Sequence, residues 1–522
     1  MVTRAVSHPP DGRASTAPAA STSAQRPWEQ DASNERRRPR TVRRSTLFFC
    51  TLVLASLSYS LLTLYSESPS SCPERELRKS GTALAARSKW EGLSIERLRQ
   101  IGLLEKREVF RCTRETLSEY CLLRGDVRVD LPGGTIRLYA EDEDTTTGEE
   151  LIQPYPRRWD TPVMVHISNV SVSSVLGREE APRCKRVHPV PAVVVSAGGY
   201  SGNIFHDFNE VLLPLFQAVH VYNGEVVIII VDLKGSWWFR SEDKIGDSIL
   251  GAMTNYPVRL LGRSEDLDGA AQGVECFSQV LVGTPHNLCL YDEEGGAQAR
   301  SEQKAGVRLR DFGNFLQRRF GFPDQDFTVG VKFTAEKRPV LGFVQRLSTR
   351  KLTNLAECIA LAEGVGFRVI VIHFEELPPK EVVRVMRQLD VFVGVHGAAF
   401  TNLVFMRERG VVAQLMPWGE YHDYLRVGRE YKNIAFSLKC TYMEYKVPVN
   451  DSSLYEKYPP DDPVLVDPYG VWQEKGVVDA MRLYHSQDIV IPGESFKLMV
   501  EHMYEVVLLQ EGQLEIPLEV QS

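Results

Sequence analysis

The sequence has few of the features that mark several common protein classes. Its 522 residues carry a formal net charge of −7, so the chain lacks the basic surplus of a general nucleic-acid binder. No two of its nine cysteines have the C-x-x-C spacing of a zinc or redox site. It has neither the G-x-S-x-G motif of a hydrolase nor a repeat of solenoid period. With 43% hydrophobic and 25% charged residues, the chain is globular and long enough for two core-forming domains.

Long uncharged stretches are also scarce, with one exception near the N-terminus. Residues 45–66 lack any charge, and six arginines crowd directly before them. As a helix these residues would span about 33 Å, enough to cross a bilayer. We therefore predict a single-pass type II anchor at 45–66, with residues 1–44 as a disordered cytosolic tail and 67–89 as a stem. A cleavable signal peptide is the alternative, but the preceding region is long and no small-x-small cleavage site follows.

The cysteines and two glycosylation sequons fit a lumenal domain without proving one. Eight cysteines follow the anchor and suit a few disulfides, whose pairing the sequence does not fix. Sequons begin at Asn169 and Asn450, and they matter only if the domain is lumenal.

Apolar runs of strand length alternate with stretches of helical length from Pro162 onward. The predicted strands in order are Val163–Ile167, Ala192–Val195, Val226–Val231, Phe277–Val282, Val340–Val344, Val369–Ile372, Val391–Val395 and Val411–Leu415. This alternation predicts an α/β protein with parallel sheets covered by helices on both faces. We expect two Rossmann-like domains facing a cleft, at 90–325 and 326–522, with the linker near Phe322–Phe327. The final helix is expected to pack back on the first domain, and ligands to bind at the strands' carboxyl ends.

The most informative stretch runs from Asp390 to Asn402, where a buried strand is followed by a tight turn and a helix. Gly397 lets the backbone come close to a ligand, and the free N–H groups after it can bind an anion. Thr401 and Asn402 add side-chain donors. The alternative is an ordinary strand–helix corner in which His396 is a core histidine.

A glycine-rich loop, Ser196–Glu210, follows the strand at Ala192–Val195. His206, Asp207 and Glu210 come at the start of the next predicted helix, where a carboxylate or imidazole can act as a general base. Alternatively, Asp207 caps that helix and His206 is structural.

A basic loop follows the strand at Val340–Val344 and contains Arg346, Arg350 and Lys351. Cations at a strand's carboxyl end can neutralise a diphosphate without a metal; the alternative is a solvated basic loop. Trp418 either stacks on a base or sugar or is packed in the core. None of the three D-x-D matches clearly follows a buried strand, so we infer no metal site.

These segments together resemble plant glycosyltransferase family 61, the xylan arabinosyl- and xylosyltransferases of the Golgi. The resemblance spans about residues 190–505 and is carried by Gly198–Glu210, Arg346–Asn354 and His396–Asn402. Ser201, Thr353 and Phe400 depart from the family's usual residues, which bears on donor or acceptor preference.

The resemblance implies a GT-B fold and inverting transfer of xylose or arabinofuranose from UDP to a xylan, without an essential metal or other cofactor. Asp207 would be the base, with His206 as the alternative. The other implied site residues fall into two groups: the acceptor-side loop with Gly199, Tyr200, Asn203 and Glu210, and the donor site with Arg346, Lys351, His396, Gly397, Ala398, Thr401, Asn402 and Trp418.

Other functions remain open from the sequence. The chain is either such a transferase or a non-catalytic lumenal protein that binds polysaccharide or scaffolds a synthase complex. An N-glycan-directed xylosyltransferase is a further alternative. The expected partners are the UDP-pentose, the polysaccharide and the Golgi membrane through residues 45–66, with a homo- or hetero-oligomer left open and no nucleic acid.

Overall fold

The computed structural model describes residues 108–143, 145–234, 237–239, 248–267, 269–290, 305–322, 333–334, 337–420 and 429–513. All described residues lie in one compact unit. The predicted tail, anchor and stem lie outside the described residues, as does nearly all of the predicted linker. Among the described helices, none is long and apolar enough to cross a membrane.

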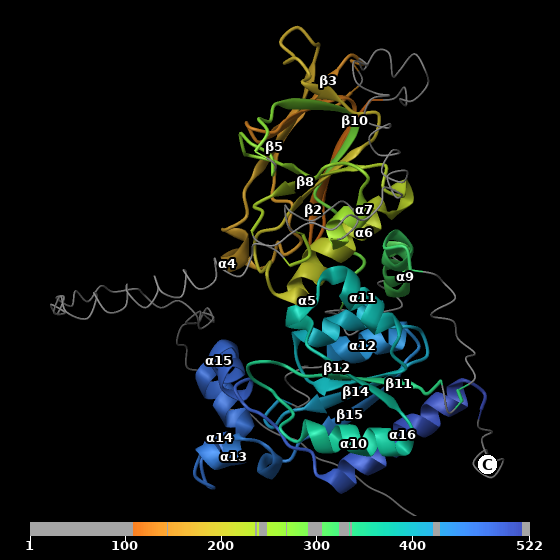
Figure 1. Cartoon of the computed structure of the whole chain (residues 1–522). Helices are drawn as coiled ribbons and strands as arrows, with labels where there is room; N and C mark the ends of the chain where they lie inside the picture. Colours follow the sequence, from red (N-terminus) through yellow and green to blue (C-terminus); the bar gives the residue numbers. More distant parts are fainter. Residues whose placement is uncertain are drawn as a thin grey trace, which may run out of the picture. The chain divides into compact units, whose positions relative to one another are not determined.

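The first sheet has ten strands in the order β4-β5-β3-β2-β10-β7-β8-β9, with β1 beside β2 and β6 beside β10 (Figure 1). The strands are β1 Val109–Arg114, β2 Glu119–Asp130, β3 Thr135–Ala140, β4 Gly148–Ile152, β5 Val170–Leu176, β6 Arg186–Val187, β7 Ala192–Ser196, β8 Val227–Val231, β9 Arg259–Leu260 and β10 Val274–Val282. The helices of this region are α4 Thr161–Met164, α5 Ile204–His206, the π-helix η1 Asp207–Leu212, α6 Leu213–Val219, η2 His220–Tyr222, α7 Ile249–Met253 and α9 Leu309–Arg319.

This sheet is mixed, and only part of it follows the expected parallel pattern. Strands β7, β8 and β9 are parallel and alternate with helices, and β10 is parallel to β7. However, β10 pairs antiparallel with β2, and β2 pairs antiparallel with both β1 and β3. The antiparallel strands begin before Pro162, in a segment whose apolar residues alternate with polar ones instead of forming continuous runs.

The two faces of the first sheet are covered differently. Val193, Val195, Ile228 and Ile230 share a cluster with helical residues of η1, α6 and α7. Their neighbours on the opposite face, such as Val194 and Ile229, pack in a cluster whose described members come mostly from strands of the same sheet. Among the described residues, no helix contributes to that second cluster, so the expected helices on both faces are found on one face only.

The strand predicted at Val163–Ile167 is also wrong. Pro162 stands in the first turn of α4, where its fixed φ suits a helix and its missing N–H costs nothing. Val163, Met164 and Ile167 are buried. The apolar run therefore correctly indicated burial in the core, but it could not distinguish a helix from a strand.

The second sheet has five parallel strands in the order β12-β11-β13-β14-β15 (Figure 1). The strands are β11 Val340–Val344, β12 Arg368–Ile372, β13 Val391–Val395, β14 Val411–Met416 and β15 Thr441–Lys446. The helices are α10 Leu355–Val365, η4 Phe374–Glu376, α11 Pro379–Arg387, the 3-10 helix η5 Ala398–Phe405, α12 Arg429–Ser437, η7 Val449–Asp451, α13 Leu454–Lys457, α14 Pro463–Val466, α15 Pro468–Tyr484 and α16 Gly493–Gln510. The four apolar runs predicted here are confirmed as strands.

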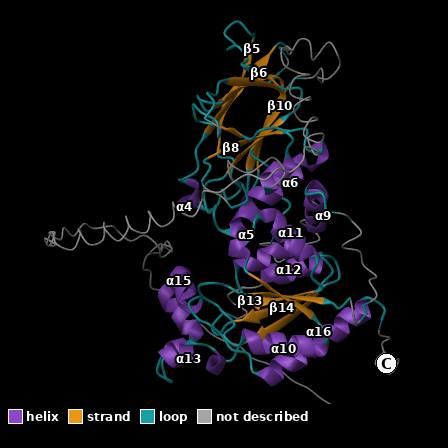
Figure 2. Ribbon diagram, viewed as in Figure 1, coloured by secondary structure: helices purple, strands orange, loops and turns teal. Residues whose placement is uncertain are grey.

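Helices cover both faces of the second sheet, as expected (Figure 2). Alternate residues of β13 separate to opposite faces: Val391 and Val393 pack with α10 and α16, while Phe392 packs with α11 and η5. The helix α16 lies against α10 and β14. The last described helix thus packs on its own sheet, and the prediction that it returns to the first domain is wrong.

One hydrophobic cluster runs from the first sheet's helices to those of the second. Phe312 of α9 lies 6.0 Å from Phe208 of η1 and 5.9 Å from Phe405 of η5, measured between ring centroids. One of these packed helices follows the carboxyl end of β7, and another follows that of β13. The segments that leave the two strands are therefore in contact with each other.

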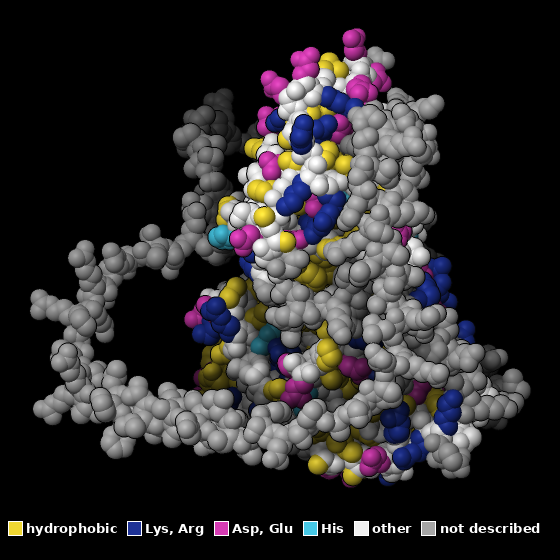
Figure 3. Space-filling model, turned by 45° about the horizontal axis from the view of Figure 1, so that its top comes forward, with side chains coloured by type: hydrophobic (Ala, Val, Ile, Leu, Met, Phe, Trp, Pro, Cys, Tyr) yellow, Lys and Arg dark blue, Asp and Glu magenta, His cyan; other side chains and the backbone are white. Residues whose placement is uncertain are grey.

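Disulfides join Cys112 to Cys121, on paired strands β1 and β2, and Cys184 to Cys276. Cys358 and Cys440 are buried free thiols, and Cys289 is buried as well. Acidic and basic side chains are interspersed over the described surface drawn in Figure 3.

Candidate active site

The carboxyl ends of β11, β13 and β14 meet at one edge of the second sheet because these strands are parallel neighbours. The segments that leave them contain Arg346 and Arg350, then His396 and Gly397, then Pro417–Glu420. The structure thus brings three sequence-distant loops to one place.

Two guanidinium groups converge on Gly397. A Cβ at this position would lie 2.9 Å from Arg350 Nη1 and 3.2 Å from Arg346 Nη1, and the backbone φ is +153°. A side chain here would strain the backbone and push the ends of the two arginine side chains away from the turn. Glycine therefore lets two cations approach the turn where backbone N–H groups are free to bind an anion.

Arg350 is held firmly in this place. Its own φ is +58°, a left-handed conformation that is uncommon for arginine, and its N–H donates to Gln487 O at 2.8 Å. Its Nη1 donates to His396 O at 3.2 Å. Burial and the neighbouring Arg346 lower the pKa of Arg350 to about 10, so it stays charged at neutral pH.

Lys351 has a different environment from the two arginines. Its backbone N–H donates to Asp488 Oδ1 at 2.9 Å, on the segment that follows α15. The two cations nearest to Gly397 are Arg346 and Arg350, and the diphosphate-binding role that the resemblance implies for Lys351 stays a prediction.

The donors predicted after Gly397 are partly used inside the protein. Ala398 is half-buried at the start of η5, whereas Thr401 and Asn402 are buried. Asn402 Nδ2 donates to Ala399 O at 3.0 Å and stabilises the first turn of η5. Trp418 donates from Nε1 to Val464 O at 3.1 Å and packs against the cluster of α13, α14 and α15, which favours a packing role.

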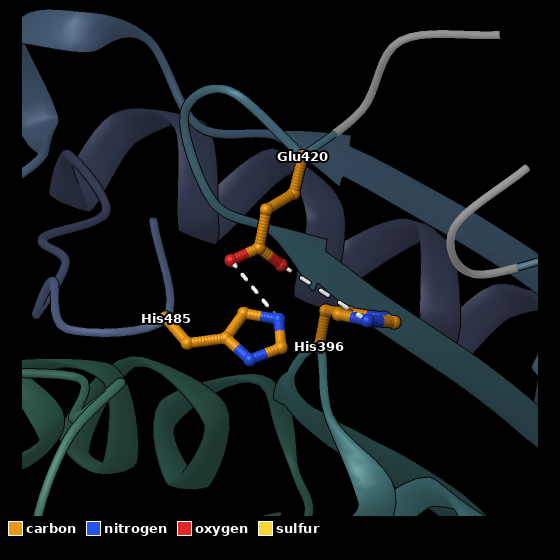
Figure 4. Close-up of side chains that lie close together, drawn as sticks. All are labelled: His396, Glu420 and His485. Carbon is orange, nitrogen blue, oxygen red and sulfur yellow. Dashed lines mark ion pairs between the residues drawn. The ribbon is translucent and has the colours of Figure 1, made fainter. Parts of the chain in front are cut away.

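Glu420 lies between two histidines at this edge (Figure 4). Its Oε1 is 3.5 Å from Nε2 of His485, and its Oε2 is 4.0 Å from Nε2 of His396. Glu420 directly follows the turn Pro417–Gly419 and is fully buried. His485 is the residue that follows the last residue of α15. Gly419 is required in that turn because a Cβ would lie 2.3 Å from Tyr484 Cε1.

The charges of this trio follow from burial and from the arginines. Burial raises the pKa of Glu420 to about 8, although Arg350 and Arg346 act in the opposite direction. Burial, reinforced by the two arginines, lowers the pKa of His485 to about 3. Burial, His485 and the arginines keep the pKa of His396 well below its ordinary value. Both imidazoles are therefore neutral at pH 7.

His396, Glu420 and His485 offer donor atoms of the types that divalent ions take, all within 4.8 Å of one another. Two guanidinium groups nearby oppose a cation because their positive charge adds to its own. Of the D-x-D matches, Asp266 pairs with Arg259, and one or both aspartates of each match lie outside the described residues. The charges at the strand ends favour an anionic ligand.

The glycine-rich loop of the first sheet is fixed by its neighbours. Gly199 has a φ of +56°, and a Cβ there would lie 2.7 Å from the Tyr155 ring. Asn203 caps α5 by accepting the N–H of Phe205 at 3.0 Å. Asp207 is fully buried and accepts hydrogen bonds from Gly202 N at 2.9 Å and Trp237 Nε1 at 2.8 Å. Burial raises the pKa of Asp207.

His206 is partly exposed and bonded to a buried carboxylate. Its Nδ1 lies 3.0 Å from Glu210 Oε2, one turn along the helix. Glu210 Oε1 receives Arg157 Nη1 and Asn209 Nδ2, both at 3.0 Å. Burial alone would raise the pKa of Glu210, but His206, Asn209 and Arg157 together outweigh it and lower that pKa.

The charged Glu210 sets the tautomer of His206. A carboxylate can only accept, so Nδ1 of His206 carries the proton and Nε2 keeps a free lone pair. Tyr200, an exposed residue of the predicted acceptor-side loop, places its ring 4.6 Å from the His206 ring. The π-helix η1 begins directly after His206, a feature common at functional sites.

Aromatic contacts link the two groups of residues. Phe205, next to His206, packs edge-on against Tyr431 of α12 at 6.4 Å, and Tyr431 lies 5.5 Å from the His396 ring. The helix α5 also contacts η5 directly. The basic strand ends and the His206–Glu210 pair therefore belong to one candidate site.

Three residues of this site were not singled out as candidates from the sequence. Glu420 follows a buried strand and a Pro-Trp-Gly turn, so the strand-end rule applied to Val411–Leu415 would have found it. Arg157 and His485 have no local pattern, because they reach the site only through the tertiary fold. The sequon residues Asn169 and Asn450 are both exposed.

A mixed α/β protein whose parallel strand ends gather cations around a glycine turn, beside an oriented histidine, has the features of a group-transfer enzyme for phosphorylated substrates. A family model for glycosyltransferase 61 matches residues 299–413. The chain is 31% identical over 396 residues to the xylan glycosyltransferase MUCI21 of Arabidopsis thaliana, which covers 72% of this chain and 76% of that protein. It is 31% identical over 380 residues to the β-1,2-xylosyltransferase XYXT1 of Oryza sativa, covering 70% and 77%. The chain belongs to glycosyltransferase family 61.

Longer relatives match over part of their length. The α-1,3-arabinosyltransferase XAT2 of Oryza sativa is 31% identical over 354 residues, 67% of this chain and 56% of that protein. The chain thus spans just over half of such relatives. Among solved structures, a flavodiiron core from Synechocystis matches 46% of this chain with a TM-score of 0.21 and 9% identity, too low to support an argument.

Proposed function

We propose that the protein transfers a pentose, xylose or arabinofuranose, from a UDP-sugar to a xylan-type polysaccharide with inversion at the anomeric carbon. The observation that carries the proposal is the convergence of Arg346 and Arg350 on Gly397, which makes a site for a diphosphate. The named functions of the family 61 relatives supply the sugar and the acceptor.

The two sheets would act as the two halves of a GT-B enzyme facing a shared cleft, with the parallel strands β10, β7, β8 and β9 as the Rossmann-like part of the first half. The second sheet would hold the donor at its carboxyl edge, and the loop at α5 would receive the acceptor. Contacts between α5 and η5, and between Phe205 and Tyr431, support this division.

The reaction makes one bond and breaks one at the anomeric carbon. An acceptor hydroxyl oxygen attacks that carbon while the bond to the UDP oxygen breaks, and UDP leaves with the electron pair. The hydroxyl proton passes to Nε2 of His206, and Glu210 stabilises the imidazolium that forms. Arg346 and Arg350 stabilise the charge that develops on the diphosphate.

We favour His206 over Asp207 as the base because of their surroundings. Asp207 is buried with both oxygens engaged by Gly202 and Trp237, as a structural residue would be. His206 is partly exposed, and its neighbour Glu210 leaves Nε2 free to accept a proton.

We further propose that no divalent metal is needed, since two arginines offer the charge that a metal would otherwise supply. The setting would be the Golgi lumen, with residues 45–66 as a type II membrane anchor. The two disulfides and the exposed Asn169 and Asn450 support an oxidising, glycosylating compartment.

The test is transfer by the full-length protein from UDP-xylose or UDP-arabinofuranose to xylo-oligosaccharides, with and without EDTA. We expect product with one donor, unaffected by the chelator. UDP-N-acetylglucosamine is a useful third donor, because an O-mannose β-1,4-N-acetylglucosaminyltransferase 2 from dog is 24% identical over 47% of this chain. Binding of xylan without transfer or hydrolysis of any donor would instead indicate a scaffold.

A further inference from the structure

Among the residues that the structure describes, three buried glutamates contact histidines, and two of these glutamates are fully paired. Glu275 receives His188 Nε2 at 2.7 Å and also Arg259 at 3.2 Å. Glu210 receives His206, Arg157 and Asn209. Each of these carboxylates has enough donors to remain charged in the protein interior.

Glu420 is the exception. It has no exposed surface, and neither of its side-chain oxygens accepts a hydrogen bond from any residue that the structure describes. The two imidazoles lie 3.5 and 4.0 Å away, too far for good hydrogen bonds. Burying an unpaired polar group costs free energy, so a donor from outside the described chain is expected at these oxygens.

The histidines on either side are themselves arranged to meet a polar group. Gln414 Nε2 lies 2.6 Å from His396 Nδ1, and its Oε1 accepts the Tyr442 hydroxyl at 2.9 Å. Because the amide nitrogen donates, Nδ1 accepts and the proton of His396 sits on Nε2, the atom that faces Glu420. His485 keeps a quarter of its side chain exposed, which gives the trio access to solvent.

We propose that Glu420, together with His485, binds hydroxyl groups of the sugar moiety of the nucleotide-sugar donor. This inference rests on the proposed function, because the arginines at Gly397 must hold the diphosphate next to it. A sugar hydroxyl both donates and accepts, so it matches a carboxyl group and a neutral imidazole at once. A divalent ion fits the donor atoms but has to overcome the repulsion of Arg346 and Arg350.

The proposal predicts that Glu420 lowers the stability of the ligand-free protein and raises its affinity for the donor. A Glu420→Gln variant keeps the size of the side chain and removes its ability to hold a charge. We expect it to melt at the same temperature as the wild type or higher, and to bind the donor on the order of 10- to 100-fold more weakly. If Glu420 has only a structural role, Glu420→Gln should lower the melting temperature and leave the affinity for the donor unchanged.

The experiment is calorimetric titration of the full-length protein with UDP-xylose, UDP and 2′-deoxy-UDP. Loss of affinity for UDP-xylose alone assigns Glu420 to the transferred sugar, whereas loss for UDP but not for 2′-deoxy-UDP assigns it to the ribose. His485→Gln is the second variant, at a partly exposed position, and should weaken the same ligand. Glu474→Gln, the same change at an exposed position of α15, should bind like the wild type.

Each contrary outcome has a separate meaning. Equal donor affinity in the wild type, Glu420→Gln and His485→Gln overturns this inference and leaves the proposed function standing. Absence of UDP binding by the wild type overturns both. A rise in melting temperature with Zn²⁺ or Mn²⁺ that Glu420→Gln abolishes makes the trio a metal site and overturns the sugar assignment.

Discussion

The two sheets each present a buried glutamate beside a histidine, and the two pairs have opposite electrostatics. At the first sheet, Arg157, Asn209 and His206 surround Glu210 and lower its pKa. At the second, burial raises the pKa of Glu420 to about 8 because no described donor reaches its oxygens. In the ligand-free protein, the number of hydrogen-bond donors, more than the proximity of a histidine, determines which carboxylate has its hydrogen bonds satisfied.

This difference assigns separate tasks to the two pairs. The complete pair at Glu210 orients a partly exposed imidazole and needs nothing further to accept a proton. The incomplete pair at Glu420 is satisfied only when a ligand arrives. The predictions below test that division, beginning with the pair whose loss should be most damaging.

His206→Ala should lower the transfer rate by about 10²–10⁴-fold, because it removes the proposed base. UDP affinity should stay near the wild type, because the proposed diphosphate site is at the strand ends of the second sheet. The melting temperature should fall somewhat, because buried Glu210 loses one of its hydrogen-bond donors. Steady-state kinetics, calorimetry and thermal melting measure the three quantities.

The matched control is Asp207→Asn. An amide accepts with one atom only, so one of the two buried donors, Gly202 N–H or Trp237 Nε1, loses its partner at a cost of about 1–3 kcal/mol. We expect a lower melting temperature and retained transfer in the folded fraction. A stable Asp207→Asn protein without activity would make Asp207 the base.

Arg346→Ala and Arg350→Ala should each weaken UDP binding by about 1.5–3 kcal/mol, the usual contribution of a hydrogen bond to a charged group. Gly397→Val should be equally damaging, because a side chain there meets both guanidinium groups. Lys351→Ala is the comparison, and it should bind UDP more tightly than either arginine variant. If Lys351→Ala loses the most affinity, the diphosphate lies elsewhere on the basic loop.

The second sheet was largely predictable from the sequence, and the first was only partly so. Residues such as Val391–Val395 lie in parallel strands buried on both faces, and continuous apolar runs report that environment directly. The strands β1 to β5 alternate polar with apolar residues, and the run Val163–Ile167 begins in the short helix α4 and continues as a turn. In both cases the neighbours in space, which a single sequence does not show, decide the structure.

The candidate site shows the same division. His396, Gly397 and Arg346 are at strand ends and could be found by pattern, whereas Arg157 and His485 arrive from elsewhere in the fold. The choice between His206 and Asp207 also depended on burial and hydrogen bonds that adjacent positions in a sequence cannot distinguish.

Glu210→Gln should lower the turnover number by about 10-fold while leaving KM for the donor unchanged. The amide no longer stabilises a protonated His206, so the loss falls on the proton transfer and not on binding. Steady-state kinetics of the variant and the wild type over a range of pH give the pH–rate profiles that test this. An unchanged profile with a uniformly lower rate would point to a packing effect.

The smallest expected effect concerns stability against pH at Glu420. Its folded-state pKa of about 8 exceeds the ordinary value of 4.5, so the folded protein binds a proton that the unfolded chain has released. The stability contributed is fully present below pH 4.5 and is lost as the pH rises through 8. His485 acts in the opposite sense over a lower range, because its pKa falls from 6.5 to about 3, and its contribution is lost as the pH decreases through 3.

Melting temperatures measured at pH 5, 7 and 9 separate the contribution of Glu420 to stability from that of His485. Glu420→Gln keeps His396, His485, Arg346 and Arg350 unchanged, so the difference from the wild type reports the carboxyl group. We expect the melting temperature of the variant, relative to that of the wild type, to increase from pH 5 to pH 9. A saturating donor should reduce that increase, because sugar hydroxyls supply the missing partners. A difference that is constant across this range would mean that Glu420 is paired in the empty protein, and the contrast with Glu210 would then disappear.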